Sequence, residues 1–382
     1  MKIFQNIDVY APEHLGRKDV VTVYDKIVKI ADAGTITADG MLFDVETVDG
    51  TDLILTPGFV DCHVHVLGGG GEGGFANRTP EATLEGLTKF GVTTVVGCLG
   101  TDGIGRDMCA LVAKTKGLRE QGMSAWCYTG SYQVPVRTLT DGITKDIMMI
   151  EEVIGTGEIA ISDHRSSQPT FEEFARLTAD TRLGGILSGK AGVVNVHLGG
   201  SPRCMDLIER VISETEIPTS QFLPTHVNRN ERLFQKAIAY ALKGGNVDFT
   251  GNENIDYEET ISDEVRVCKG IRRMLDAGVD PKHITISSDG QGSMPRFSKE
   301  GVFLGMGVGQ SSCLLKEVKE CVEMAQIPLD TALSAITANP AATLSLKGKG
   351  KIQEGFDADL CVLTRELEIQ EVVARGKTVY TK

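Results

Sequence analysis

The sequence predicts an α/β fold, a distorted (β/α)8 barrel with a small β-sandwich domain formed from both chain ends. Short runs typical of β-strands fill the first 55 residues and return after about Leu346. Between them, eight short apolar segments alternate with amphipathic segments, which is typical of a barrel. The chain has 382 residues, enough for both domains. We place the sandwich in residues 1–55 plus 346–382 and the barrel in residues 56–345.

The β-rich ends consist of short apolar runs separated by Asp and Gly. Candidate strands near the amino terminus lie within residues 21–31, 41–50 and 52–58, and the same rhythm returns in residues 349–380. Because the β rhythm returns after the barrel, we expect the two ends to meet and form one small domain beside it.

The barrel prediction rests on eight strand candidates and the helical segments between them. The predicted strands are 59–65, 93–99, 124–130, 157–161, 193–197, 221–226, 246–251 and 283–289. The predicted helices include 80–90, 110–121, 171–183, 204–216, 231–245 and 264–278. The first of these is predicted to start with Thr79 as N-cap and Pro80 at N1, and to stop at Gly91.

Composition excludes several classes of partner. A net charge of −13 argues against nucleic acid and against an anionic membrane surface. The nine cysteines contain no CxxC pair, which indicates reduced thiols and a cytoplasmic protein. No amino-terminal apolar segment indicates a signal peptide, and no apolar run of about 18 residues indicates a membrane span.

Two histidines, His63 and His65, lie two positions apart on the first barrel strand and therefore share one face. We expect Phe59, Asp61, His63 and His65 to face inward and Val60, Cys62 and Val64 to face the helices. Two imidazoles on one face suit a divalent metal. Taken alone, the pattern favours two satisfied or exposed histidines that bind no metal.

The positions of other polar residues favour the metal site. His197, His226 and Asp289 also end predicted barrel strands, where barrel active sites are built. Four imidazoles and a carboxylate exceed one tetrahedral zinc site and suit two metals about 3.5–4 Å apart that share a hydroxide. Such a pair needs a bridging anion, which we expect near the fourth strand. The three other histidines, in loops or beside helices, are His14, His164 and His283.

Several motifs resemble the amidohydrolase superfamily, and within it the isoaspartyl dipeptidases. They are "TPGFVDCHVH", "HVHVLGGGGEGG", "VVGCLGTD", "SDHRS", "LPTHVNRN", "SSDGQGS" and the tail "TANPAATLSLKGKGKIQEGFDADLCVL". This resemblance covers nearly the whole chain. It implies a binuclear zinc centre with a bridging hydroxide, cleavage of β-aspartyl (isoaspartyl) dipeptides, and a homo-oligomer.

The sequence departs from that family at the bridging ligand. The family's pattern has a lysine near strand four that CO2 carboxylates, but no lysine lies between Lys145 and Lys190. The resemblance aligns Glu158 with that position, and we hypothesise that Glu158 bridges the metals directly. Its shorter reach requires a closer strand, which Gly155 and Gly157 permit. Alternatively, Glu158 is a solvated charge and the site holds one metal or none.

The resemblance also assigns the catalytic roles. Asp289, beside the hydroxide, takes its proton during attack and passes it to the leaving amine. Tyr132 matches the family's tyrosine on the oxyanion side, although a loop tyrosine taken alone more often packs than catalyses.

Substrate contacts follow from the same resemblance. Glu72, with Ser293, is the expected partner of the substrate ammonium. Backbone near Gly70 and the hydroxyl of Thr101 match contacts to the α-carboxylate. Alternatively, Glu72 is a solvated charge in a loop and does not contact the substrate.

Two arginines are the expected partners of the leaving residue's carboxylate. Arg165 and Arg229 carry guanidinium groups that bind a carboxylate through two parallel hydrogen bonds. The alternative for either arginine is pairing with a structural carboxylate such as Asp163.

Two other functions compete with the dipeptidase. The first is another amidohydrolase, either a cyclic amidase or an N-acyl-amino-acid deacylase, which would not need the substrate contacts above. The second is a metal-free scaffold homologue. Such a protein typically loses the ligand histidines, whereas all four are present in this sequence.

Overall fold

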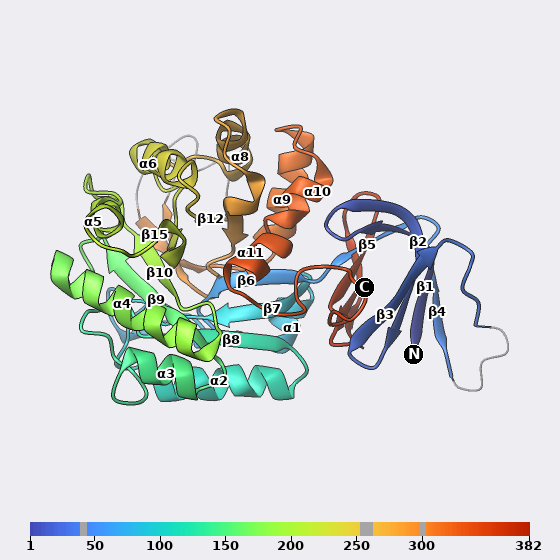
Figure 1. The fold of residues 1–382 in the computed structure, drawn as a ribbon, viewed down its shortest axis with the longest axis horizontal. Helices are drawn as coiled ribbons and strands as arrows, with labels where there is room; N and C mark the ends of the chain where they lie inside the picture. The colour runs from blue at the N-terminus through green and yellow to red at the C-terminus, as the bar shows by residue number, and fades with distance from the viewer. Residues whose placement is uncertain (39–43, 253–262, 298–302) are drawn as a thin grey trace.

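The computed structural model describes residues 1–38, 44–252, 263–297 and 303–382. A large part that carries the helices adjoins a smaller β-rich part that holds both chain ends (Figure 1). The large part contains a curled parallel sheet, and the chain ends form a separate sheet. The predicted fold class, a distorted (β/α)8 barrel with a small sandwich domain, is confirmed.

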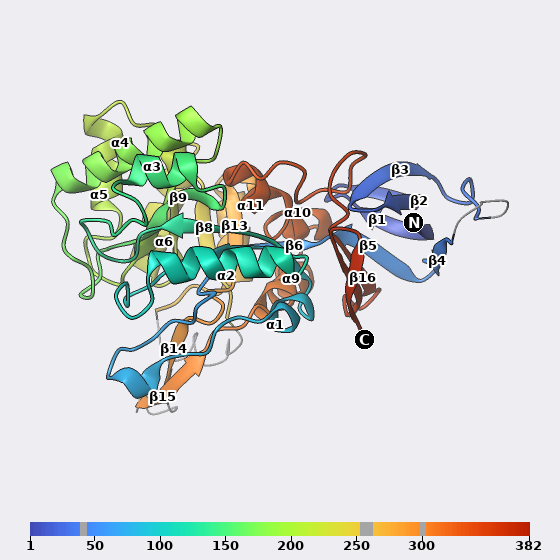
Figure 2. The same cartoon turned by 90° about the horizontal axis from the view of Figure 1, so that it is seen from below.

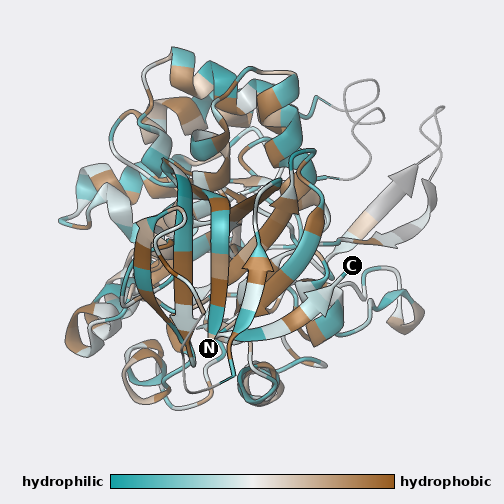
Figure 3. Cartoon of the chain, turned by 90° about the vertical axis from the view of Figure 1, so that its right-hand side faces the viewer, coloured by the Kyte–Doolittle hydropathy of each residue, from teal (hydrophilic) through white to brown (hydrophobic). Residues whose placement is uncertain are grey.

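The small domain contains one sheet to which both ends of the chain contribute. Its strands are β1 (Lys2–Tyr10), β2 (His14–Val23), β3 (Lys26–Asp32), β4 (Glu46–Asp49), β5 (Leu53–Pro57), β16 (Leu360–Thr364), β17 (Ile369–Ala374) and β18 (Lys377–Thr381). The chain ends meet where β5 and β16 pair antiparallel, from Leu53 opposite Thr364 to Pro57 opposite Leu360. Hydrophobic and polar residues mix along its strands (Figure 3), and part of the predicted strand 41–50 lies outside the described residues.

The barrel contains all eight predicted strands. They are β6 (Phe59–Val64), β7 (Val92–Gly97), β8 (Ser124–Thr129), β9 (Val153–Ile161), β10 (Val193–Leu198), β11 (Phe222–Thr225), β12 (Val247–Thr250) and β13 (Ile284–Ser287). Strands β6 to β11 form one parallel sheet in chain order, and β12 pairs with β13. A parallel bridge between Val64 and Gly290 joins the two ends of this series. The carboxyl ends of the strands therefore share one rim.

The helices lie around the barrel and between it and the small domain (Figures 1 and 2). They are α1 (Leu84–Thr88), α2 (Met108–Glu120), α3 (Ile143–Met149), α4 (Phe171–Ser188), α5 (Asp206–Glu214), α6 (Glu231–Ala241), α8 (Val267–Asp276), α9 (Cys313–Glu323), α10 (Leu329–Ser334) and α11 (Ala338–Thr343), with short 3-10 turns at Phe75–Asn77, Thr219–Gln221 and Pro281–His283. Within the described ranges, none of the helices is both long and apolar enough to cross a membrane. After β13, a hairpin of β14 (Ser293–Phe297) and β15 (Phe303–Val308) extends away from the barrel (Figure 2).

The predicted start of the first barrel helix is wrong. The helix begins at Leu84, and the side chain of Thr83 caps it by accepting a hydrogen bond from the amide of Gly86. The hydroxyl of Thr79 is used elsewhere: it accepts from the amide of Gly69 at 2.6 Å and donates to the carbonyl of Gln291 at 2.5 Å. Thr79 therefore ties the glycine run to the segment that follows Asp289.

The prediction that side chains along β6 alternate strictly between the barrel interior and the helices is also wrong. Val60 and Cys62, predicted to face the helices, pack inside the barrel with Val96, Tyr128, Ile154, Val193 and Leu223 from five other strands. Phe59, predicted to face inward, packs in the larger cluster that includes the surrounding helices. The ladder to β7 changes register between Phe59 and Val60 and again between Asp61 and Val64, which breaks the two-residue period.

A buried lysine ties the carboxy-terminal segment to the barrel. Lys349 lies 2.6 Å from Asp357 and 2.5 Å from Asp359, and it also donates to the hydroxyl of Ser124 on β8. Lys349→Met should lower the free energy of unfolding by about 3–5 kcal/mol, because it leaves a buried carboxylate without its cation. Urea unfolding measures this, with exposed Lys347→Met as the matched control. Equal midpoints for the two variants would contradict the expectation.

Candidate metal centre

Strand β9 brings Glu158 into the barrel. Its ladder with β10 is regular at Gly155 and Thr156 but shifts register before Ile159, opposite Asn195. A Cβ at Gly155 would lie 2.3 Å from the carbonyl oxygen of Val193, and one at Gly157 would lie 2.8 Å from Asn195. Both positions therefore require glycine. The close approach predicted for β9 is present, and the strand begins at Val153 rather than at Gly157.

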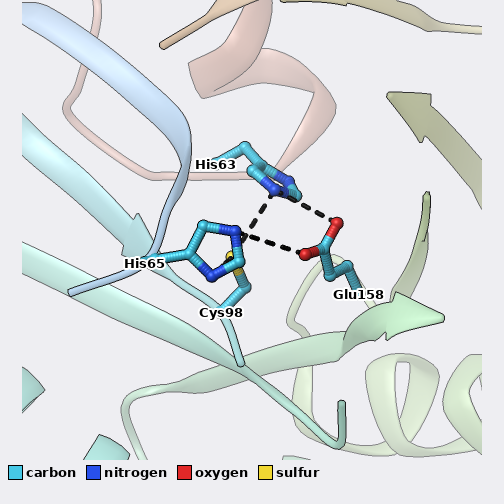
Figure 4. Close-up of side chains that lie close together, drawn as sticks. All are labelled: His63, His65, Cys98 and Glu158. Carbon is cyan, nitrogen blue, oxygen red and sulfur yellow. Dashed lines mark hydrogen bonds and ion pairs between the residues drawn. The ribbon is translucent and has the colours of Figure 1, made fainter. Parts of the chain in front are cut away.

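Glu158 is fully buried, and four imidazoles surround its carboxylate. Its Oε1 lies 3.3 Å from Nε2 of His65. Its Oε2 lies 3.3 Å from Nε2 of His63, 3.2 Å from Nδ1 of His197 and 3.8 Å from Nε2 of His226. Figure 4 shows His63, His65 and Glu158 pointing toward one another, with Cys98 beside the two histidines. Glu158 is therefore not a solvated charge.

Asp289 approaches the same group from the end of β13. Its Oδ1 lies 3.0 Å from Nε2 of His65 and 3.7 Å from Nε2 of His63. Asp289 and His226 both have positive φ angles, 48° and 64°, which are uncommon outside glycine. Such strained positions concentrate at functional sites, where surrounding structure enforces them.

Neighbouring polar groups orient three of the four histidines around Glu158. Nδ1 of His63 lies 3.1 Å from Oδ1 of Asn195. Nε2 of His197 lies 3.1 Å from Asp163, and Nδ1 of His226 lies 2.6 Å from the hydroxyl of Thr250. In each of these three rings the opposite nitrogen faces Glu158, an orientation typical of metal-binding histidines.

The sequence patterns do not predict these orienting residues or Cys98. Asn195 lies two positions before His197 on β10, so shared strand parity could have indicated it. Cys98 follows β7 directly, at the same rim as the histidines. Asp163 was considered only as a partner of arginine.

Electrostatics keep both carboxylates charged. Burial opposes the charge of Glu158, but the surrounding imidazoles outweigh burial and hold its pKa well below the usual range. Burial would likewise raise the pKa of Asp289, yet His65 and the neighbouring histidines lower it to about 2. Burial lowers the pKa of His226 to about 3, so this imidazole is neutral. The site therefore offers anionic oxygens and a neutral nitrogen.

These residues fit divalent metal ions. Across the described part of the chain, neither Oε1 of Glu158 nor Oδ1 of Asp289 accepts a hydrogen bond, although both are buried. Ligands of a tetrahedral ion with bonds of about 2.0–2.1 Å lie about 3.4 Å apart, close to the spacing between these oxygens and the imidazoles. Imidazole and carboxylate ligands suit a borderline-soft ion such as zinc.

Tyr132 and Arg165 border the metal centre. The hydroxyl of Tyr132 lies 2.9 Å from Nδ1 of His197, and burial, together with Glu158, raises the pKa of this phenol well above its usual value. The guanidinium of Arg165 lies 5.3 Å from the centre of the Tyr132 ring. Tyr132 is therefore a neutral donor at the centre's edge.

Arg165 is paired with two carboxylates. Its guanidinium lies 2.8 Å from Asp163 and 3.0 Å from Glu72. Arg165 therefore pairs with Asp163, as the alternative interpretation expected, and it also contacts Glu72, a predicted substrate residue. Oε1 of Glu72 also accepts a hydrogen bond from the hydroxyl of Thr101 at 2.8 Å. Three predicted substrate residues, Glu72, Thr101 and Arg165, thus form one network.

The remaining predicted substrate residues lie beside the same rim. A Cβ at Gly70 would lie 2.4 Å from the carbonyl oxygen of Asn77 and 3.5 Å from Cβ of Ser293, so Gly70 and Ser293 are neighbours. The backbone amide of Arg229 donates a hydrogen bond to the carbonyl of His226. The positive charge of its guanidinium opposes the rise that burial causes in the pKa of Tyr132. Nε of Arg229 is buried and has no hydrogen-bond partner among the described residues.

The other three histidines lie elsewhere. His14 binds Asp8 in the small domain, His164 is exposed, and His283 contacts Asn246.

Comparison with known proteins agrees with this geometry. Residues 190–379 match the Amidohydrolase family. A β-aspartyl dipeptidase from the thermophilic, keratin-degrading Fervidobacterium islandicum AW-1, solved in complex with β-Asp-Leu dipeptide, is 42% identical, with a TM-score of 0.91 over 100% of this chain and 96% of that chain. A second structure of a β-aspartyl dipeptidase from Fervidobacterium islandicum AW-1 is 40% identical, with a TM-score of 0.89 over 100% of this chain and 97% of that chain. An N-acetylglucosamine-6-phosphate deacetylase from Pasteurella multocida, 16% identical with a TM-score of 0.66 over 100% of both chains, shares the fold.

Proposed function

Since the chain belongs to the β-aspartyl dipeptidases of the amidohydrolase family, we propose that it hydrolyses the isopeptide bond of β-aspartyl dipeptides at a binuclear metal centre. Family membership makes it a hydrolytic enzyme. The substrate, the two metals and the role of each residue are the proposal.

The position of Glu158 between two groups of ligands carries the proposal. Oε1 faces His65, which also lies beside Asp289, and Oε2 faces His63, His197 and His226. Ligand atoms of His63 and His65 form one cluster with Glu158, and those of His197 and His226 form a second cluster with it. One carboxylate can therefore contact two ions, the role that a carboxylated lysine fills in the family's pattern. We propose zinc for both ions because imidazole and carboxylate are its usual ligands.

The protein groups then divide the work of hydrolysis. Glu158, Asp289 and the four histidines would hold two divalent ions, which would supply an activated water nucleophile at neutral pH and polarise the scissile carbonyl. Asp289, ionised and beside His65, accepts the proton of the nucleophile and delivers it to the leaving amine. Tyr132 donates its phenol hydrogen to the oxyanion that develops at the carbonyl.

The charged network at the rim matches the substrate's charges. We propose that Glu72 and Ser293 bind the ammonium group, while Gly70 and Thr101 bind the α-carboxylate. Arg165 and Arg229 bind the carboxylate of the leaving residue. Because Glu72 and Arg165 contact each other at 3.0 Å, the substrate would insert its two opposite charges between them.

A substrate panel tests this function. β-Asp-Leu should be cleaved, whereas α-Asp-Leu, a hydantoin and an N-acetyl amino acid should be cleaved far more slowly. Preferred turnover of the hydantoin would favour a cyclic amidase, and preferred turnover of the N-acetyl amino acid would favour a deacylase. Fewer than one bound ion per chain would favour the metal-free scaffold.

Tyr132→Phe is expected to reduce kcat about 10²–10³-fold, because it removes one oxyanion donor. Metal content should not change, since the phenol is not a proposed ligand. Steady-state kinetics with β-Asp-Leu, together with metal analysis, measures both.

Tyr128→Phe is the matched control for this variant. Tyr128 is equally buried, and its hydroxyl donates to the carbonyl of Cys62 at 3.1 Å rather than toward the centre. A Tyr132→Phe enzyme as active as the Tyr128→Phe enzyme would remove Tyr132 from the reaction.

A further inference from the structure

A buried thiol lies within the proposed metal centre. Cys98 is 0% exposed, and its Sγ lies 3.6 Å from Nε2 of His63 and 3.9 Å from Nδ1 of His65 (Figure 4). Ligand atoms of His63, His65, Cys98 and Glu158 all lie within 4.8 Å of one another. No other cysteine joins a metal-ligand cluster of this kind in the described part of the chain.

The orientation of His63 directs a lone pair toward this thiol. The amide of Asn195 donates to the carbonyl of Leu223 at 3.3 Å, which turns its oxygen toward Nδ1 of His63. A hydrogen on Nδ1 of His63 would bind that oxygen, which would leave the lone pair of Nε2 for a metal ion. That nitrogen faces Sγ of Cys98 at 3.6 Å and Oε2 of Glu158 at 3.3 Å.

These distances fit the edges of a metal polyhedron. A tetrahedral ion with bonds of about 2.3 Å to sulfur and about 2.1 Å to nitrogen holds those two atoms about 3.6 Å apart.

A second observation points to a ligand. Oε1 of Glu158 is buried and, within the described ranges, accepts no hydrogen bond. The backbone that carries Cys98 forms the wall beside it: a Cβ at Gly100 would lie 2.8 Å from Cε1 of His65 and 3.4 Å from this oxygen. A buried carboxylate oxygen without a hydrogen bond and a buried thiol thus lie beside the same two histidines, an arrangement that a cation would complete.

We propose that Cys98 supplies a sulfur ligand to the ion held by His63 and His65, an inference that rests on the metal centre proposed above. On binding, the S–H bond breaks, its proton passes to solvent, and the electron pair left on sulfur forms the bond to the ion. The thiolate adds one negative charge to the donor set. Sulfur is a soft ligand, so the site selects zinc or cobalt over magnesium or manganese.

Cobalt substitution tests the assignment in the full-length chain. Cys109, the exposed cysteine among the nine, is first changed to serine so that surface binding does not contribute. Metal-free protein is then titrated with Co²⁺ alone. A near-ultraviolet thiolate-to-cobalt charge-transfer band is expected, and Cys98→Ala should abolish it while the visible cobalt bands remain. Cys127→Ala, which removes a buried thiol on the helix side of β8, should retain the band.

The outcomes separate the sulfur ligand from the metal centre itself. Visible cobalt bands without a charge-transfer band in the parent protein would overturn the role of Cys98 and leave the metal centre intact. Survival of the band in Cys98→Ala would also overturn it. Absence of any cobalt binding would overturn both proposals.

A measurement without substitution covers the case in which Cys98→Ala does not fold. Zinc-edge X-ray absorption of the zinc-loaded parent should require a sulfur neighbour at about 2.3 Å. A first shell of nitrogen and oxygen alone would contradict the proposal.

Discussion

Glu158→Ala is expected to yield a folded chain that no longer retains two metal ions and no longer cleaves β-Asp-Leu. The carboxylate is the group that both halves of the centre share, with Oε1 beside His65 and Oε2 beside His197. Loss of a partner outside the first ligand sphere already costs about 10–100-fold in metal affinity, and loss of a bridging ligand should cost more. Metal analysis after dialysis, with circular dichroism as the folding check, measures this.

Glu158→Gln is the matched variant, since it preserves size and removes the charge. It should also lose metal, because a neutral amide does not balance the charge of two cations. Retention of two ions per chain by either variant would rule out the bridging role. Because no carbamate is involved, metal content and activity of the parent protein should be independent of added bicarbonate.

Asp289→Asn is expected to reduce kcat by about 10²–10⁴-fold, the range for loss of a general acid or base. An amide can still offer an oxygen to a metal but cannot take a proton. The proton-transfer role therefore predicts a loss of kcat that exceeds any loss of metal. Steady-state kinetics on metal-saturated protein measures it.

Metal content distinguishes the two roles of Asp289. If activity falls only in proportion to bound metal, Asp289 is a ligand and not the proton carrier. If activity is unchanged at full metal loading, neither role is correct.

Much of the proposed site could be predicted from the sequence because barrel topology gathers strand ends. His63, His65, His197, His226 and Asp289 lie at the ends of four different strands, yet they surround Glu158 as that topology requires. Glu158 itself was found through resemblance and through the need for an anion, not through spacing.

The features that could not be predicted from the sequence depend on local irregularities of the backbone and on individual side-chain contacts. The register shifts along β6 break the alternation that placed Val60 and Cys62 toward the helices. Threonine is a common N-cap residue, but the hydroxyl of Thr79 accepts a hydrogen bond from the amide of Gly69 instead of capping a helix. Cys98 carried no signal in its spacing, because a single cysteine after a strand is usually packing.

The central claim is that Glu158 bridges two metal ions. A crystal structure of the zinc-loaded protein, with anomalous scattering at the zinc edge, tests it most directly. We expect two ions about 3.5–4 Å apart, with one carboxylate oxygen of Glu158 on each. A single ion, or two ions with Glu158 turned away from one of them, would contradict the account.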